Sequence, residues 1–481
     1  MSVSAPVKLT IKDYKSDLHN DWCPGCVAPD TRILTPGGSA PIVDIKVDDL
    51  VLGHDGRSHR VTEVMSHWHE APMRRVTIQF LGTIVLTDDH PIWCAALSAS
   101  ERAMDWRPAG TVRLGDLIAY PTAALARADV VSAVRTDDPS TIATLASTMS
   151  SEDYVLLRVE DNEVIAYNGF VHNLEVEDVH SYVTEVGALH NCGDFGILTG
   201  IQMALAQLQL DPDRVACFSG IGCSGKTPHY INAYGFHTLH GRVLPVATGG
   251  RLANTSLTVL ALGGDGDGYG IGAGYFVNTG RRNLNFTYMV HNNNVYGLTK
   301  GQASPTLSKG KKTKSMPEQA IQDGINPIAM AVAAGYTFIA RAYALEPKYL
   351  ASIIVRAIQH QGSALVDVLQ TCPTYNDLYT KEWYEGADLA EKKSRLYKLE
   401  ERGYDGKVQD PTDEQEIVAK KAAAVARSYE REPIPIGVYY EALLPTYEDE
   451  IYKRIPAMKD TPLAEMDTFK RNIDPLLEAM R

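Results

Sequence analysis

Hydrophobic and polar positions follow different patterns in different parts of the chain. Between residues 26 and 191, short runs such as 83–87 alternate apolar and polar positions and are separated by Gly, Asp and Asn. This pattern predicts an all-β domain. From residue 192 onward, apolar runs such as 258–262 and 287–290 alternate with helical periods. We therefore expect an α/β fold, a parallel sheet flanked by helices, with an all-β domain inserted into it.

The change of pattern at both ends of the β region is abrupt. Joining Gly25 directly to Cys192 would give Trp-Cys-Pro-Gly-Cys-Gly-Asp-Phe-Gly, a continuous glycine-rich loop entering a helix. The β region is thus interpreted as an insertion. The expected segments are a leader at 1–25, the insertion at 26–191, an α/β core at 192–378 and a Glu- and Lys-rich helical extension at 379–481.

Composition narrows the class of protein. With 481 residues, 44% of them hydrophobic, the chain can fill two or three globular cores. A net charge of -13 offers no general attraction for nucleic acid or an anionic membrane, since either needs concentrated positive charge. There is no apolar leader and no run of about 18 apolar residues, so a cytoplasmic protein is expected. In that compartment seven cysteines point to metal binding or catalysis before disulfides.

The two ends of the insertion carry matching chemistry. Cys26 opens it, and His190, Asn191 and Cys192 close it. Protein splicing needs a thiol for an acyl shift, a second thiol to accept the acyl group, and an Asn whose amide cyclises to cut the chain. The segment 26–31, the pair Thr87 and His90, and the segment 174–180 add three further blocks in the order found in inteins, which this region resembles.

The resemblance assigns roles to these residues. Thr87 and His90 would polarise the Gly25–Cys26 peptide, and two histidines would assist the cyclisation of Asn191. Asn173 departs from the Asp that many inteins carry, so a proton transfer there would need another group. The splicing set is Cys26, Thr87, His90, His180, His190, Asn191 and Cys192.

Other interpretations of the insertion are a β domain with a chance terminal Cys and Asn, and a Hedgehog-type processing domain. The latter would share the fold but would need neither Asn191 nor a second thiol. The segment 123–153 is too short and polar for an endonuclease, which indicates a mini-intein.

In the precursor Cys23 and Cys26 form a C-x-x-C pair, and a reversible disulfide between them would prevent Cys26 from acting as a nucleophile.

Outside the insertion, the strand at 258–262 runs into glycines and Asp265, and the next strand ends in Asn292, Asn293 and Asn294. Glycines after a parallel strand let the backbone approach a diphosphate, and an Asp there can bind magnesium. The pairing resembles the thiamine-diphosphate motif. The alternative is that these loops merely connect strands.

In that family Mg²⁺ is bound by residues that match Asp265, Asn293 and the carbonyl of Val295, with Asp267 as an alternative ligand. The contacts expected for thiamine diphosphate and its Mg²⁺ are Cys223, His240, Gly264, Asp265, Gly266, Asn293, Val295, Gly297, Leu298 and Thr299.

Four cysteines of the host lie in Gly- and Pro-rich loops: Cys23, Cys192, Cys223 and Cys372. Four thiolates suit a [4Fe-4S] cluster, and zinc is the inorganic alternative. A neighbouring thiamine site favours the cluster, because oxidative decarboxylation must pass electrons on. Cys217 is interpreted as a packed thiol and Cys94 as a structural thiol of the insertion.

Together with the segments 234–242 and 296–302, these motifs resemble the β subunit of archaeal-type 2-oxoacid:ferredoxin oxidoreductases. The resemblance implies oxidative decarboxylation of a 2-oxoacid such as pyruvate or 2-oxoglutarate, transfer of the acyl group to coenzyme A and of electrons to ferredoxin. It also implies an α, or fused γα, subunit that supplies the glutamate for the aminopyrimidine. Lys226 would face the substrate carboxylate, and His240 would contact the cofactor.

Alternatives remain open for these assignments. Lys226 could be a solvated loop cation, and His240 a hydrogen-bonded core histidine. The lysines near 309–314 could steer ferredoxin or simply be solvated. The whole host could be a non-oxidative thiamine-dependent decarboxylase or synthase with a zinc or vacant cysteine site, or a decayed enzyme that carries a splicing element.

Overall fold

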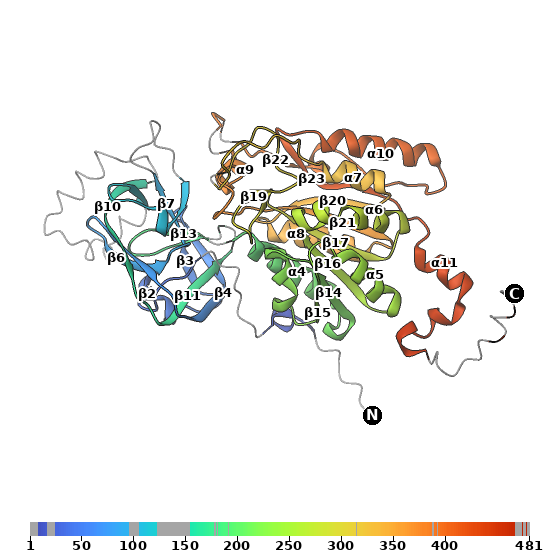
Figure 1. Ribbon diagram of the computed structural model, residues 1–481, viewed down its shortest axis with the longest axis horizontal. Helices are drawn as coiled ribbons and strands as arrows, with labels where there is room; N and C mark the ends of the chain where they lie inside the picture. The colour runs from blue at the N-terminus through green and yellow to red at the C-terminus, as the bar shows by residue number, and fades with distance from the viewer. Residues whose placement is uncertain are drawn as a thin grey trace, which may run out of the picture.

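The computed structural model describes residues 8–16, 25–95, 105–122, 154–177, 179, 181–190, 192–313, 315–386, 389–391, 393–466, 474 and 478. Several predicted positions lie outside the described residues: Cys23, the segment 123–153, His180, Asn191 and Lys314. The described chain forms an all-β domain and an α/β domain, which lie side by side in Figure 1.

The insertion folds as the predicted β domain. Its described strands form an eight-stranded sheet in the order β12-β13-β7-β9-β10-β5-β6, with β8 paired to β7, a three-stranded sheet β11-β4-β3 and a hairpin β1-β2. The strands are β1 Arg32–Thr35, β2 Gly38–Pro41, β3 Leu50–Leu52, β4 Ser58–His69, β5 Met73–Ile78, β6 Gly82–Thr87, β7 Pro91–Ala95, β8 Asp105–Pro108, β9 Leu117–Pro121, β10 Tyr154–Ile165, β11 Gly169–Val176, β12 Ser181–Val183 and β13 Ala188–His190. Alternate apolar residues such as Val76, Leu86 and Leu174 fill its core.

The host contains the predicted parallel sheet. Its order is β15-β14-β16-β17-β21-β20-β23-β22, and β23 runs antiparallel to β20. The strands are β14 Val215–Ser219, β15 Tyr234–His237, β16 Thr258–Gly264, β17 Phe286–Asn292, β20 Phe338–Tyr343, β21 Ser363–Leu369, β22 Leu396–Lys398 and β23 Ile434–Glu441; a separate small hairpin pairs β18 Val295–Tyr296 with β19 Gln302–Ala303.

Helices cover both faces of this sheet, as the continuous apolar strands require (Figure 1). On β16, Leu260 packs with α4 and α8, whereas Val259 packs with the helices of the opposite face. The first face carries α4 Asp194–Leu208 and α8 Pro347–Gln359, and the second carries α5 Val243–Ala253, α6 Ala273–Arg282, α7 Pro327–Ala334 and α10 Glu414–Ser428. The carboxyl ends of the central strands meet at one edge, where the glycine- and asparagine-rich loops begin.

The expectation of a helical extension at 379–481 was incomplete. This region does contain α9 Lys381–Glu385, α10 and α11 Tyr447–Arg454, but it also contributes β22 and β23 to the main sheet. The interior of β23 is buried against β20. Because this single apolar strand lies among charged helical segments, the Glu and Lys content of the region concealed it.

The insertion enters the host immediately before α4. Met65 of β4 packs into the core of the host, and the two domains are joined by an ion pair of 3.1 Å between Lys348 and Glu177. The Nζ of Lys15, in the leader, donates to the carbonyl of Thr62 at 3.0 Å. The insertion therefore contacts both the α/β host and the leader that precedes Gly25.

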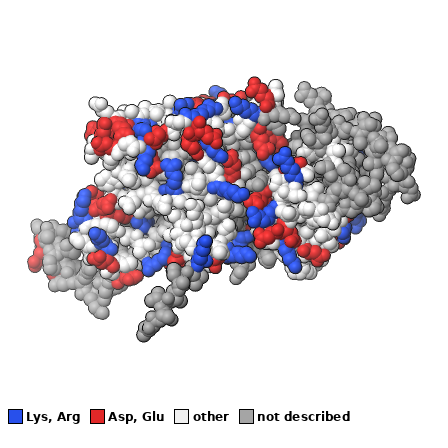
Figure 2. Space-filling view, turned by 180° about the vertical axis from the view of Figure 1, so that it is seen from behind, with Lys and Arg blue, Asp and Glu red and all other residues white. Residues whose placement is uncertain are grey.

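The surface carries both signs of charge. On the face in Figure 2, Lys and Arg side chains are interspersed with Asp and Glu. Among the described residues, no helix has both the length and the apolar character required to cross a membrane.

Candidate functional site

The Gly25–Cys26 junction is enclosed by β6 and β11. The N–H of Cys26 donates to Thr87 Oγ1 at 2.9 Å, and the N–H of Thr87 donates to the carbonyl of Cys26 at 2.9 Å. Val27 exchanges backbone hydrogen bonds with His172 of β11 at 2.8 and 2.9 Å. Cys26 is only 3% exposed. The junction is therefore held by both flanking strands, and the Thr87 hydroxyl accepts a hydrogen bond from its amide nitrogen.

His90 lies directly beneath Gly25. A Cβ placed on Gly25 would be 2.3 Å from both Cα and Cβ of His90, so only glycine fits here. Burial lowers the pKa of His90 to about 3, with the main chain of Cys26 opposing that shift. The imidazole is thus neutral at physiological pH, and the residue packs directly against Gly25. Its role in polarising the peptide stays a prediction.

Asn173 contacts the carbonyl side of the junction, which the sequence analysis did not predict. The side-chain Nδ2 of Asn173 donates to the carbonyl oxygen of Gly25 at 3.0 Å. The sequence marked Asn173 only as a departure from Asp. At the other junction, the side chain of His190 is not described, and neither are His180 and Asn191.

A cavity of about 150 Å³ opens at the carboxyl ends of β16 and β17. All ten residues expected around thiamine diphosphate line it. Sequence reasoning missed others that also line it: Ile221, Gly222, Ser224, His291, Tyr296 and Gln370. The fold thus gathers five separate stretches of the chain at one site, although the function of each residue stays a prediction.

The two aspartates after β16 have different surroundings. Asp267 Oδ1 accepts from the N–H groups of Gly241 at 2.7 Å and Ile221 at 3.2 Å, and it lies 3.2 Å from Nδ1 of His240. It ties three loops together and orients His240. Its Oδ2, however, is buried and has no hydrogen-bond partner among the described residues, so a positioning role and metal binding both stay predictions for Asp267.

Asp265, in contrast, is buried among neutral donors. Its Oδ2 accepts from the N–H of Asn294 at 3.1 Å and from the hydroxyls of Ser304 and Thr306. Burial raises the pKa of Asp265 to about 6. A buried carboxylate whose described contacts are all neutral fits a bound cation, which would supply the missing positive charge.

Other features of the cavity fit a polar ligand. Ser224 Oγ and His291 Nε2 are buried, and the described part of the chain offers neither of them a hydrogen-bond partner. A Cβ on Gly266 would lie 2.1 Å from the ring of Tyr296. The main chain of Gly266 therefore packs directly against Tyr296, and both residues line the cavity. Gly266 also begins a π-helical turn, a geometry often found at functional sites.

Three of the four predicted cluster cysteines come together. Cys192 precedes α4, Cys223 begins the 3₁₀ segment Cys223–Tyr230, and Cys372 follows β21. Burial and the nearby Asp194, Cys223 and Cys372 raise the pKa of Cys192 well above its usual range. The fourth, Cys23, is not described, and no group of three or more His, Cys, Asp or Glu side chains arranged to hold a metal is found among the described residues.

The remaining cysteines behave as packed thiols. Cys217 lies in β14 and is 1% exposed, and burial raises its pKa to about 12. Cys94 is fully buried in β7 of the insertion. Neither residue contacts the cavity that the ten predicted residues line.

A buried pair joins the cysteines to the cavity. Nδ1 of His291 lies 2.6 Å from Oδ1 of Asp194, and Oδ2 of Asp194 lies 3.3 Å from Sγ of Cys192. Gln370 Nε2 is 3.7 Å from the same sulfur and also lines the cavity. The position of Asp194, two residues after the predicted cluster ligand Cys192, was the feature of the sequence that could have revealed this contact. Burial raises the pKa of Cys223, and the nearby Lys226 opposes that shift. Lys226 does not line the cavity.

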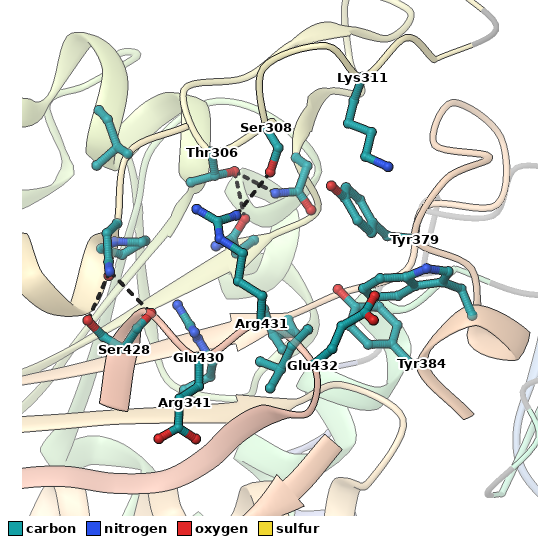
Figure 3. A pocket seen from close by; sticks show the side chains of 18 residues that line it. Thr306, Ser308, Lys311, Arg341, Tyr379, Tyr384, Ser428, Glu430, Arg431 and Glu432 are labelled. Carbon is teal, nitrogen blue, oxygen red and sulfur yellow. Dashed lines mark hydrogen bonds between the residues drawn. The ribbon is translucent and has the colours of Figure 1, made fainter. Parts of the chain in front are cut away.

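A second cavity, of about 260 Å³, is lined in part by Thr306, whose hydroxyl donates to Asp265. Figure 3 shows Thr306 and Ser308 on one wall, Arg431 between them and Glu432, and Tyr379 and Tyr384 opposite. Thr306 links the two cavities, because it lines this one and its hydroxyl donates to Asp265, which lines the other. The same hydroxyl lies 2.9 Å from Asn292 Oδ1. Lys311, one of the predicted loop lysines, is at the rim of this cavity.

The comparisons with known proteins agree with these motifs. The family "Thiamine pyrophosphate enzyme, C-terminal TPP binding domain" matches residues 215–368, and the family for the C-terminal part of the pyruvate ferredoxin oxidoreductase beta subunit matches 372–454. The 2-oxoacid:ferredoxin oxidoreductase 1, subunit beta, of Aeropyrum pernix is 50% identical over 305 residues, which cover 62% of this chain and 92% of that protein.

Solved structures match each domain separately. A 2-oxoglutarate:ferredoxin oxidoreductase from Magnetococcus marinus aligns with 32% identity and a TM-score of 0.51, covering 60% of this chain and 90% of that one. The gp41-1 intein aligns with 17% identity and a TM-score of 0.24, covering 35% of this chain and 98% of that one. On the identity and coverage of its relatives, the chain belongs to the family of 2-oxoacid:ferredoxin oxidoreductase β subunits, here interrupted by an all-β domain.

Proposed function

We propose that this chain is an unspliced precursor whose inserted domain excises itself. The observation that carries the proposal is the geometry at Gly25–Cys26, where the backbone N–H of Cys26 donates to Thr87 Oγ1 at 2.9 Å. Cys26 would attack the Gly25 carbonyl to form a thioester, and Cys192 would then accept the acyl group. Cyclisation of Asn191 would release the insertion and free the amine of Cys192. The acyl group would then move from the Cys192 sulfur to that amine, leaving a native peptide between Gly25 and Cys192.

Mutation of Asn191 tests this function. Asn191→Ala removes the amide that cyclises, so the C-terminal part should stay attached, while added thiol should still cleave the chain before Cys26. Intact mass spectrometry distinguishes the 481-residue precursor from its cleaved and ligated forms. Formation of the normal ligated product by this variant would rule out the assignment.

For the spliced protein we infer CoA-dependent oxidative decarboxylation of a 2-oxoacid, pyruvate or 2-oxoglutarate, with electrons passed to ferredoxin. The main support is the cavity that brings Asp265 and Asn293 together beside the glycines of β16. Asp265, the side chain of Asn293 and the carbonyl of Val295 would hold Mg²⁺ and, through it, a diphosphate. When bound, thiamine diphosphate supplies a nucleophilic carbon and a sink for the electron pair released with carbon dioxide.

The chain's own residues would orient the ligand and exclude water. Asp267 holds His240 at the cavity, and Asp194 holds His291 with its Nε2 directed to a ligand. The cluster set would be Cys23, Cys192, Cys223 and Cys372, with zinc as the alternative metal. An α, or γα, subunit would supply the activating glutamate. Iron and acid-labile sulfide in the spliced protein would distinguish a [4Fe-4S] cluster from zinc.

The metal-ligand assignment is tested in the spliced protein with its partner subunit. Asp265→Ala should lose Mg²⁺-dependent binding of thiamine diphosphate, and with it the reduction of a viologen by 2-oxoacid and coenzyme A. Asp460→Ala is a matched control, since it removes the same charge from an exposed position near the C-terminus. Unchanged thiamine affinity in Asp265→Ala, measured by calorimetry, would refute the assignment.

A further inference from the structure

The carbonyl of the scissile peptide accepts a hydrogen bond from a buried side chain. Nδ2 of Asn173 lies 3.0 Å from the oxygen of Gly25, whereas Thr87 contacts the nitrogen side of the same junction. The two contacts therefore act on different atoms of the reacting group. Asn173 is fully buried, so within this site water does not compete for its amide.

The orientation of the Asn173 amide follows from its other contacts. Its Oδ1 accepts from the backbone N–H of Leu174 at 2.8 Å and from the hydroxyl of Tyr182 at 2.6 Å. A backbone N–H can only donate, so the atom that faces it must be the oxygen. The NH₂ group is consequently the one that faces Gly25. Tyr182 lies on β12, and Asn173 lies on β11, so two neighbouring elements of the insertion fix this geometry.

We propose that Asn173 stabilises the oxyanion of the first splicing step and that Tyr182 is its positioning residue. The inference rests on the splicing function proposed above. In this step the Cys26 sulfur bonds to the Gly25 carbonyl carbon, and the carbonyl electron pair moves onto the oxygen, which Asn173 contacts. Collapse of that intermediate breaks the bond between the Gly25 carbon and the Cys26 nitrogen. The proton lost by the thiol ends on the released amine, so no further reactant is needed.

This assignment gives a chemical use to the Asn that replaces the more common Asp. An amide is a permanent donor, whereas an ionised carboxylate would repel a developing negative charge. Preorganised donors directed at such a charge accelerate acyl transfer, and removing one lowers the rate by about 100- to 1000-fold. The Asn173 amide needs no rearrangement to act, because its oxygen is already anchored on the far side.

The test uses the Asn191→Ala chain as the parent and measures the rate of thiol-induced cleavage before Cys26. Asn173→Ala and Asn173→Leu should each slow that cleavage by about 100-fold or more. The matched control is Asn278→Ala: Asn278 Nδ2 also donates to a main-chain carbonyl, that of Gly274 at 2.9 Å, but it lies in helix α6 of the host. This control should cleave at the parental rate.

Two further measurements distinguish a chemical role from a structural one. In a Cys26→Ala chain that retains Asn191, cleavage after Asn191 should proceed at an unchanged rate when Asn173 is replaced; an equal loss of both cleavages would overturn the proposal. Tyr182→Phe should slow the first step by about tenfold in the parent and have no further effect together with Asn173→Ala. Additive effects of the two substitutions would remove Tyr182 as a positioning residue.

The outcomes also separate this inference from the proposed function. If the parent shows no thiol-dependent cleavage, splicing itself is refuted and the role of Asn173 falls with it. If the parent cleaves and Asn173→Ala cleaves equally fast, splicing stands and only the oxyanion role is overturned.

Discussion

Replacing Gly25 by alanine changes one methyl group at the splice junction. The added Cβ would lie 2.3 Å from Cα and Cβ of His90 and 2.6 Å from its Cγ. Favourable carbon contacts lie at about 3.5–4.0 Å, so a displacement of roughly 1 Å or more is required. His90 Cα belongs to the main chain between β6 and β7, and it cannot move aside by a side-chain rotation.

The displacement should appear in the rate of splicing rather than in loss of the fold. Overpacking a filled site costs about 1–3 kcal/mol, which a domain of this size can absorb. A misplacement of about 1 Å at reacting atoms, however, can cost about 100-fold in rate. The junction carbonyl would be moved relative to Thr87, His90 and Asn173 together. We therefore expect Gly25→Ala to form thioester about 100-fold more slowly than the natural chain.

Time-resolved intact mass spectrometry of freshly purified precursor measures this rate. Gly37→Ala is the matched control, because a Cβ there has no atom within 4 Å among the described residues. It should splice at the natural rate. Splicing of Gly25→Ala within about threefold of the natural chain would show that the close contact with His90 does not constrain the junction, and the steric argument would fail.

Other expectations concern both domains. Burial raises the pKa of Glu63 from 4.5 to about 7, so ionisation of Glu63 destabilises the folded chain as the pH rises through that range. At pH 8, Glu63→Gln should therefore stabilise a splicing-blocked precursor by roughly 1–3 kcal/mol, which a higher melting temperature would show. At pH 4.5 the substitution should have little effect. Arg341→Ala removes the guanidinium that forms an ion pair with the buried Asp367 at 2.8 Å. The free energy of unfolding of the spliced protein in urea should fall by about 3–5 kcal/mol. A fall below about 1 kcal/mol would contradict this. For the proposed iron–sulfur cluster, the spliced Cys217→Ala protein should contain as much iron as the natural one, and the spliced Cys223→Ala protein should contain none. Equal iron in the two variants would remove Cys223 from the proposed ligands.

Several features could be predicted because they depend on local patterns. The strand at Thr258–Gly264 was recognised from a continuous apolar run followed by glycines, and the β domain from alternating runs. The strand Ile434–Glu441 was missed, since one short apolar run among charged helices resembles a linker until β20 supplies its pairing partner. Local periodicity cannot show which distant strand completes a sheet.

The sequence by itself determined which chemical groups the protein carries and in what order. Residue types at a characteristic spacing identify the thiols of Cys26 and Cys192 and the Asn that can cyclise. The same holds for the pair Asp265 and Asn293. Such spacing is informative because the carboxyl ends of neighbouring parallel strands must meet at one edge of the sheet. The cavity to which all the predicted cofactor residues contribute follows from that rule.

Only the tertiary structure showed that neighbouring groups of the same type have different surroundings. Asp265 and Asp267 are two residues apart, yet the first is buried among neutral donors and the second is bonded to the loops at Gly241 and Ile221. Asn173, in sequence a mere departure from Asp, contacts a carbonyl 148 positions away. A hydrogen bond needs its two atoms about 3 Å apart in the right direction, and for residues this distant in the chain, packing alone determines that.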